Sequence, residues 1–348
     1  MKNNVLKIGI VGTGFISQVA HIPNFYFIDN CQIQSIAEIR PRLRAKISQR
    51  YEIESNYSTH QELLTHSDVD AIVVITPRNM TGPVAHDCLK AGKHVFTEKP
   101  MAGDHCQAKK LVQESKKNNV KYVVGFMRRF DNGVLYAKKL INHLTTTKEL
   151  GQISYVRVHC FQGEDYCNID GFIDTGETKI EKFNSWPEYP QWLPDKYHQN
   201  YKRFLNVFCH NINLIRFLLD KKLTVEYARM VPENGRLIIF DCGEFACSLE
   251  AGNFTYQGWD EIVEIFFQHG RLRIKLPPAL LKNVPASVEL YRGDEHTFSV
   301  PHLGWSWAFK NQAEAFINDI LCDQLSVNTG EDALLDMQLI ENIWEKLL

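Results

Sequence analysis

The chain has 348 residues, of which 39 are Lys or Arg and 41 are Asp or Glu, so its formal charge is −2 with histidine neutral. This balance gives no electrostatic attraction toward nucleic acid or anionic lipid, and we expect neither as a partner. With 44% hydrophobic and 23% charged residues the composition is that of an ordinary globular protein. The length is typical of about two domains.

Nine cysteines are scattered along the sequence without any C-x-x-C pair. An odd, scattered set favours reduced core thiols in a cytoplasmic protein over disulfides or a zinc site, so no metal site is expected. Lys2 and Lys7 flank a short apolar run, but no small-residue cleavage site follows it. No apolar stretch approaches the roughly 18 residues of a membrane span. The sequence therefore predicts neither export nor membrane insertion.

Strand-like and helix-like segments alternate in the first third of the chain. Short β-rich runs are expected at 6–11, 33–39, 71–75, 94–96 and 121–126, with helical segments such as 15–26, 83–91 and 104–118 between them. This alternation predicts an α/β fold with a parallel, doubly wound sheet.

Strand-like runs follow one another directly from about residue 150. They are expected at 153–161, 224–231, 236–240, 244–250, 261–268, 271–276 and 287–292, with helices at about 203–219, 307–320 and from 331 to the end. Strands that follow one another without a helix between them pair as hairpins, so this part of the sequence predicts a large, mostly antiparallel sheet. We predict two domains, 1–126 and 127–348, with a cleft where they meet and the last helical part of 307–348 packing back onto the first.

The turn Gly12-Thr13-Gly14-Phe15-Ile16-Ser17 has the form G-x-G-x-x-S and directly follows the first strand. The first glycine permits the tight turn, and the second lets backbone N–H groups approach a pyrophosphate. Ser17 stands at the third glycine position, where a small side chain still allows close packing. Alone the pattern also fits a turn without any ligand, so its context decides. We predict cofactor contacts from Gly12 through Ile16.

Glu38 ends the second strand, 24 residues after Gly14. That spacing is near the one expected for a carboxylate that accepts hydrogen bonds from the adenosine ribose hydroxyls. A carboxylate there would repel a 2′-phosphate, so NAD is favoured over NADP. NADP stays an alternative cofactor because of Arg40, since an arginine can pair with that phosphate. Solvated loop charges are the alternative for both side chains.

Thr76-Pro77 and Glu98-Lys99-Pro100 end two later strands, at the edge where open α/β sheets bind ligands. We predict cofactor contacts from both stretches. Pro100 restricts the backbone of Lys99, which we expect to point into the crevice beside a bound nicotinamide. A solvated surface lysine is the alternative.

Four polar residues line one side of the expected helix 203–219. Arg203, Asn206, His210 and Asn213 fall within a sector of roughly 80° at helical periodicity, beside a broad apolar sector. A polar stripe on a buried helix needs partners, either within the core or in a substrate cleft. Donors and acceptors together suit a hydroxyl-rich ligand, so we predict substrate contacts here. The aromatic segment 186–201, which ends at Tyr201, suits sugar faces, a packed loop or a subunit interface equally.

The sequence resembles the Gfo/Idh/MocA oxidoreductases, named for glucose-fructose oxidoreductase and inositol dehydrogenase. The resemblance lies in stretches 8–14, 70–77, 91–100, 124–131 and 150–153, including Glu-Lys-Pro and Gly-Phe-x-Arg-Arg-Phe. It implies a Rossmann domain, a second α/β domain whose large open sheet is often used for oligomerisation, a nicotinamide cofactor and usually a sugar, cyclitol or related polyol substrate. A homodimer or homotetramer is expected. The resemblance also implies cofactor and substrate contacts from Arg128.

Two positions depart from the family. Its Asp-x-x-x-His pair aligns with Asn206 and His210, so the histidine is kept and the carboxylate is not. Thr81 stands where many members have a histidine.

Oxidising a secondary alcohol removes the hydroxyl proton as hydride leaves carbon, so two groups must converge on that oxygen. Histidine, with a reference pKa of about 6.5, suits proton exchange near neutrality, whereas lysine at about 10.4 needs a lowered pKa. We predict that His210 exchanges the proton and Lys99 polarises the oxygen. With Asn206 nearby, His210 is neutral more often, and Lys99, with Tyr201 as a further candidate, carries more of the proton transfer. An NAD-dependent glycoside-cleaving enzyme and a non-catalytic NAD-binding sensor are the alternatives.

Overall fold

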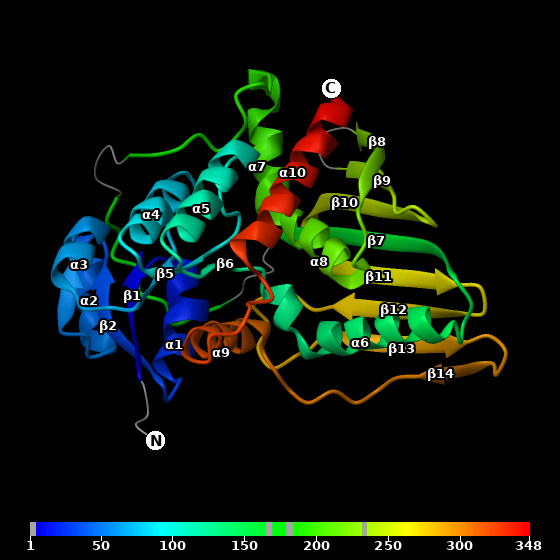
Figure 1. The fold of residues 1–348 in the computed structure, drawn as a ribbon, viewed down its shortest axis with the longest axis horizontal. Coiled ribbons are helices and arrows are strands. Elements are labelled where there is room, and N and C mark those ends of the chain that lie inside the picture. The colour runs from blue at the N-terminus through cyan, green and yellow to red at the C-terminus, as the bar shows by residue number, and fades with distance from the viewer. Residues whose placement is uncertain (1–4, 165–168, 179–183, 232–234) are drawn as a thin grey trace. The chain divides into compact units, whose positions relative to one another are not determined.

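The computed structural model describes residues 5–164, 169–178, 184–231 and 235–348 (Figure 1). The chain forms two compact units, each assembled from three segments. The first comprises 1–126, 169–202 and 309–337, and the second 127–168, 203–308 and 338–348. That residues 1–126 and 127–348 fold as separate domains stays a prediction.

The first unit is built on a six-stranded parallel sheet with the order β3-β2-β1-β4-β5-β6. The central strands are apolar because helices cover both faces; every residue of β4 is buried. Strand order reverses between β1 and β4, which places a crevice at their carboxyl ends. The strands are β1 (Leu6–Val11), β2 (Cys31–Ala37), β3 (Ser55–Tyr57), β4 (Ala71–Val74), β5 (His94–Thr97) and β6 (Tyr122–Val124).

Helices from distant parts of the chain complete this unit. The expected helix 15–26 is a π-helical turn, η1 (Ser17–His21), followed by α1 (Ile22–Tyr26). Phe316 of α9 (Ala308–Leu321) packs against Phe25 and Phe96 in the core of the first unit. The others are α2 (Pro41–Arg50), α3 (His60–His66), α4 (Arg78–Lys90) and α5 (His105–Lys117).

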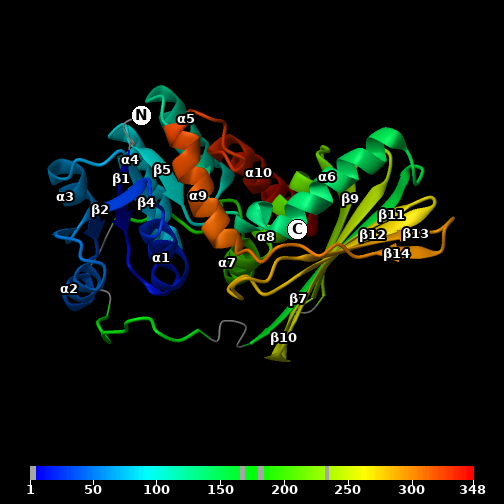
Figure 2. The same cartoon turned by 90° about the horizontal axis from the view of Figure 1, so that it is seen from below.

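The second unit is built on an eight-stranded sheet with the order β14-β13-β12-β11-β7-β10-β9-β8. Of the described strands in this sheet, only β7 and β10 pair in parallel, so the predicted fold class is confirmed. The helices α6 (Asn132–Thr147) and α8 (Cys209–Leu219) contact one face of this sheet (Figures 1 and 2). The strands are β7 (Ile153–Glu164), β8 (Thr224–Val231), β9 (Gly235–Asp241), β10 (Ala246–Gln257), β11 (Trp259–Phe267), β12 (Gly270–Leu276), β13 (Ser287–Arg292) and β14 (Thr297–Ser299).

The continuous helix expected over 203–219 is wrong. A helix α7 (His198–Val207) and α8 are separated at Phe208, whose φ is −86° and ψ −4°. A helical residue has ψ near −42°, so the backbone turns at Phe208, whose carbonyl accepts from the N–H groups of both Asn211 and Ile212, each at 3.1 Å. The polar stripe is therefore divided, with Arg203 and Asn206 on α7 and His210 and Asn213 on α8. The remaining short elements are η2 (Met127–Phe130), η3 (Asp195–Tyr197) and α10 (Gly330–Leu347).

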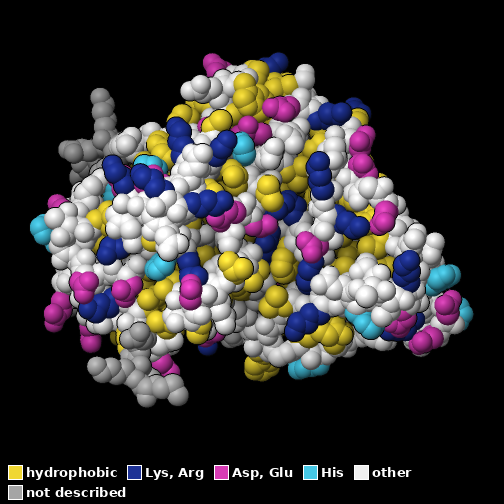
Figure 3. Space-filling model, viewed as in Figure 1, with side chains coloured by type: hydrophobic (Ala, Val, Ile, Leu, Met, Phe, Trp, Pro, Cys, Tyr) yellow, Lys and Arg dark blue, Asp and Glu magenta, His cyan; other side chains and the backbone are white. Residues whose placement is uncertain are grey.

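Eight cysteines lie in the described residues, all as thiols outside any disulfide, and six are buried. Cys106, in α5, and Cys322, directly after α9, are exposed, so the expectation of core thiols is wrong for these two; Cys167 lies outside the described residues. Within the described ranges, no helix combines the length and the apolar composition needed to cross a bilayer. The cytoplasmic location stays a prediction. Acidic and basic side chains are interspersed over the face in Figure 3.

Candidate cofactor and catalytic site

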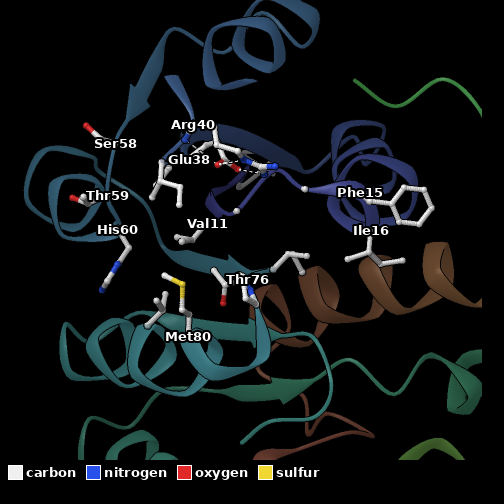
Figure 4. A pocket seen from close by; sticks show the side chains of 17 residues that line it. Val11, Phe15, Ile16, Glu38, Arg40, Ser58, Thr59, His60, Thr76 and Met80 are labelled. Atoms are coloured by element: carbon white, nitrogen blue, oxygen red, sulfur yellow. Dashed lines mark hydrogen bonds and ion pairs between the residues drawn. The ribbon is translucent and has the colours of Figure 1, made fainter. Parts of the chain in front are cut away.

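A pocket of about 370 Å³ opens at the carboxyl ends of β1, β2 and β4 in the first unit (Figure 4). It is lined by most of the residues expected to bind the cofactor. These are Gly12, Gly14, Phe15, Ile16, Glu38, Arg40, Thr76 and Pro77. Residues that the sequence analysis did not single out for the cofactor also line it, among them Ser58, Thr59 and His60 before and in α3, and Met80 and Val84 in α4.

The glycine turn has the backbone geometry that a dinucleotide-binding loop needs. Gly12 has φ +90°, and a Cβ there would lie 2.2 Å from the carbonyl oxygen of Ile75, so only glycine fits. Above Gly14 the nearest atom to a Cβ is Nη2 of Arg40, at 3.7 Å. The space over Gly14 is therefore open toward the pocket, which allows a ligand to approach the backbone closely.

Glu38 is held at the pocket wall by several donors. Its carboxylate accepts from the backbone N–H and hydroxyl of Thr13, at 2.9 and 3.0 Å, and from Nε and Nη2 of Arg40, at 2.8 and 3.0 Å. Burial raises the pKa of Glu38, but these donors outweigh it, so the pKa lies below its usual value and the group is ionised at neutral pH. Thr13 thus contributes by fixing Glu38.

A second carboxylate stands beside the predicted catalytic lysine. Glu98 accepts from the backbone N–H of Lys99 at 3.0 Å, and its other oxygen lies 2.7 Å from Nε2 of His21. Burial raises the pKa of Glu98, but His21 and Lys99 more than compensate and lower it. The π-helical turn η1 directs His21 into the core, where its ring packs against Phe96. The predicted cofactor contact of Glu98 stays a prediction.

Thr81 contacts the strand-end residue Thr76. Their hydroxyl oxygens are 3.2 Å apart, and Thr81 also bonds the carbonyl of Pro77 at 3.3 Å. The threonine found in place of the family histidine therefore supports the Thr76-Pro77 turn at the pocket wall.

The structure gives Arg128 a buried partner in the second unit. Its Nη2 donates to Glu261 at 2.5 Å, and Asn211 donates to the other oxygen of that carboxylate at 3.1 Å. All three residues are buried. An ion pair so enclosed is costly to break by removing one member. Ligand contacts from Arg128 stay a prediction.

The polar stripe meets different surroundings along its length. Asn213 is buried and accepts from Nε of Arg129 at 2.8 Å. Asn206 and His210 are half-buried, and Arg203 is exposed. The pairing of Asn213 with Arg129 matches the alternative of satisfied core groups, whereas the substrate contacts predicted for the other three stay predictions.

The aromatic segment before α7 packs within the first unit. Trp186 lies so close to α4 that a Cβ on Gly82 would be 2.4 Å from its ring. Tyr201 is buried and donates its hydroxyl hydrogen to the carbonyl of Gly103 at 3.1 Å. These contacts favour the packed-loop alternative for this part of the segment. The proton-transfer and substrate roles of Tyr201 stay predictions.

Lys99 belongs to the first unit and His210 to the second, so their joint action stays a prediction. Sequence reasoning missed His21, which contacts Glu98, and Gln18, whose side-chain amide donates to the carbonyl of Thr13 in the glycine turn at 2.9 Å. A signal was present for both, because each is a polar residue within an otherwise apolar helical stretch directly after the glycine turn.

Comparison with known proteins agrees with the geometry of the first unit. Residues 6–126 match the Gfo/Idh/MocA model, described as an oxidoreductase family with an NAD-binding Rossmann fold. A myo-inositol 2-dehydrogenase from Thermotoga maritima is 30% identical over 143 residues, 41% of this chain and 42% of that relative's length.

Two solved structures share the fold over nearly the whole chain. A scyllo-inositol dehydrogenase from Lactobacillus casei with bound NAD(H) and scyllo-inositol has a TM-score of 0.71 at 22% identity, covering 99% of this chain and 97% of the other. A 3-ketoreductase from Actinomadura kijaniata in complex with TDP-benzene and NADP has a TM-score of 0.75 at 18% identity, covering 99% and 98%. The resemblance to the Gfo/Idh/MocA oxidoreductases is thus confirmed over residues 6–126, the part that matches the family's NAD-binding Rossmann fold.

Proposed function

We propose that the protein is an NAD(P)-dependent dehydrogenase or ketoreductase. It transfers hydride between a nicotinamide cofactor and a secondary alcohol or ketone of a sugar, amino sugar, nucleotide sugar or cyclitol. The observation that carries the proposal is one pocket that combines the open backbone of Gly14 with the ionised, buried carboxylate of Glu38. Relatives named as inositol dehydrogenases and a ketoreductase support the substrate class.

The residues of the pocket fit a dinucleotide. The Gly12–Gly14 turn suits a diphosphate, and Glu38 suits the ribose hydroxyls, with NAD favoured. When bound, the cofactor supplies the hydride acceptor or donor. Lys99 hydrogen-bonds and polarises the reacting oxygen of the substrate, and His210 exchanges the proton. Because Asn206 cannot stabilise an imidazolium as a carboxylate would, Lys99 carries a larger part of the proton transfer.

One observation favours a second candidate. Asn206 stands where the family has an aspartate, so a non-catalytic NAD-binding sensor on the same fold is the runner-up. A sensor would bind NAD yet oxidise no polyol and reduce no keto-sugar.

The test has two parts. NADH and NADPH fluorescence is followed while a panel of inositols, free sugars, amino sugars and nucleotide sugars is screened in both directions. Binding of each cofactor is titrated in parallel to the native protein and to Gly14→Ala, whose methyl group has room in the fold but occupies the space through which a ligand would approach the backbone. We expect turnover with a member of the panel, and loss of cofactor binding in Gly14→Ala with an unchanged unfolding midpoint. A native protein that binds neither cofactor refutes the proposal.

We also infer a homodimer or homotetramer that uses the face of the eight-stranded sheet opposite α6 and α8. Half-buried aromatic and aliphatic side chains occupy that face between ion pairs that already satisfy one another, such as Arg157 with Glu250 at 2.9 Å. The occupant we propose is a second copy of this chain.

A further inference from the structure

Residues 169–178, here called the strap, follow β7 in sequence but belong to the first unit, where they contact residues 15–18 (Figure 2). The side-chain amide of Gln18 makes two hydrogen bonds to the backbone of Ile173, with N–O distances of 3.1 and 2.7 Å. The ring of Phe172 packs edge-on against Phe15, with centroids 5.0 Å apart. The strap is therefore fixed to the residues that directly follow the glycine turn.

The strap carries a carboxylate onto the N-terminus of α2. The two oxygens of Glu177 accept from the backbone N–H groups of Arg42 and Leu43, each at 3.0 Å. Thr175 donates its hydroxyl hydrogen to the same carboxylate at 2.6 Å. The Glu177 side chain is only 10% exposed. A helix N-terminus favours anions because its first N–H groups have no partner in the helix, and here an anion of the chain itself occupies it.

This carboxylate stands next to the position that distinguishes NAD from NADP. Helix α2 begins at Pro41, three residues after Glu38, and Arg40 between them lines the pocket. A 2′-phosphate on the adenosine ribose would need an arginine and free N–H groups there. Both are already engaged, because Arg40 is paired with Glu38 and the N-terminus of α2 with Glu177.

We propose that Glu177 is a specificity-determining residue: by occupying the N-terminus of α2 as a built-in anion, it excludes the 2′-phosphate and selects NAD over NADP. The inference rests on the proposed function and deepens it, because it assigns the discrimination to a residue that lies 139 positions from Glu38 and outside the glycine-turn pattern.

The electrostatics agree with this role. Burial raises the pKa of Glu177, but the hydrogen bonds from Thr175 and from the backbone of Arg42 and Leu43 prevail and lower it, so the carboxylate is charged at neutral pH. The pKa of Arg40 is raised, first by its hydrogen bond to Glu38, with Glu177 contributing at longer range. A second negative charge beside Arg40 thus disfavours an incoming phosphate.

The experiment compares dissociation constants for NADH and NADPH, measured by fluorescence titration of the full-length protein at fixed ionic strength. Glu177→Ala removes the anion, and Glu54→Ala removes an exposed carboxylate of the same unit as a matched control. We expect Glu177→Ala to bind NADPH about tenfold more tightly than the native protein does, with NADH affinity changed by less than about threefold. Glu54→Ala should leave both affinities unchanged.

Unchanged NADPH affinity in Glu177→Ala, or an equal loss for both cofactors, overturns the inference, since the latter indicates a purely structural role. Either of these results leaves NADH binding by the native protein intact. A native protein that binds neither cofactor would instead contradict the proposed function itself. If the alanine variant does not fold, Glu177→Gln keeps the size of the side chain and its contact with Thr175. It should still raise the affinity ratio of NADPH to NADH, and an unchanged ratio counts against the inference.

Discussion

Glu38 is buried at the pocket wall and yet ionised, because Thr13 and Arg40 replace the water that it loses. Its pKa is lower in the folded protein than in the unfolded chain. A group with a depressed folded pKa stabilises the fold above its unfolded pKa, and this contribution is lost as pH falls through the folded pKa. For Glu38 this loss of stability begins as the pH falls to the ordinary pKa of a glutamic acid, about 4.3.

Replacing Glu38 with Gln should remove this pH dependence. We expect the free energy of unfolding at pH 7 to fall by about 1–3 kcal/mol, because charge-assisted hydrogen bonds are lost. The difference between variant and native protein should shrink as pH drops from about 5 toward 3. Urea unfolding over this pH range measures it. A constant difference across the range would mean that Glu38 is not the linked group.

Lys99 is tested by its removal. If it polarises the reacting oxygen or moves its proton, Lys99→Ala should lower turnover by about 10²-fold or more, and should lower turnover far more than NADH affinity. Lys117→Ala, on the exposed end of α5, is the matched control and should leave turnover unchanged. Near-native turnover of Lys99→Ala in the same steady-state assay would refute the role.

The residues that sequence alone could identify are those whose function depends on nearby positions. Gly12 and Gly14 are recognisable because the turn they form is local, and Glu38 because its distance from the turn is set by one βα unit. His21 and Glu98 are 77 positions apart, and Glu177 and Leu43 are 134 apart. Pairs of this kind follow from the path of the chain, which no local pattern contains.

The glycine turn between β1 and η1 depends on close backbone approach. Gly12→Ala would place a methyl group 2.2 Å from the carbonyl oxygen of Ile75, in addition to its strain at φ +90°. Gly92 also has a positive φ, +73°, but nothing lies within 4 Å of its Cβ position. We expect Gly92→Ala to cost about 1 kcal/mol and Gly12→Ala at least about 3 kcal/mol. Urea unfolding of both variants checks this, and equal costs would mean that the turn relaxes.

Strong periodicity made most elements predictable. The ranges 6–11, 224–231 and 287–292 match β1, β8 and β13. The edge strands β3 and β14 were missed, because each has three residues of which one is apolar, whereas the equally short β6 is apolar throughout. The break at Phe208 was missed for a different reason: the apolar sector continues through it, so the composition retains a helical period although the backbone turns.

The sheet of the second unit presents rows of side chains on the face that α6 and α8 leave uncovered. One row runs Tyr227, Ile239, Ser248 and Arg157 across four paired strands. Another ends in Tyr291 and Phe298, whose ring centroids are 4.7 Å apart. Eight strands about 4.8 Å apart span about 34 Å, wide enough for an interface of about 800 Å² per partner.

If a second copy covers this face, the protein should have two or four times its chain mass of 40.2 kDa. Light scattering after size-exclusion chromatography, at micromolar concentration, measures this mass.

Combining Tyr227→Glu with Phe298→Glu places charges at positions where the native side chains are 44% and 60% exposed, so the chain should fold but dissociate toward 40.2 kDa. Burying unpaired carboxylates in the interface costs several kcal/mol, which accounts for the dissociation. Leu325→Glu, at an apolar side chain of the first unit that is 93% exposed, is the control and should leave the mass unchanged. A native protein of 40.2 kDa, or a double variant with the native mass, would show that the copies do not meet at this face.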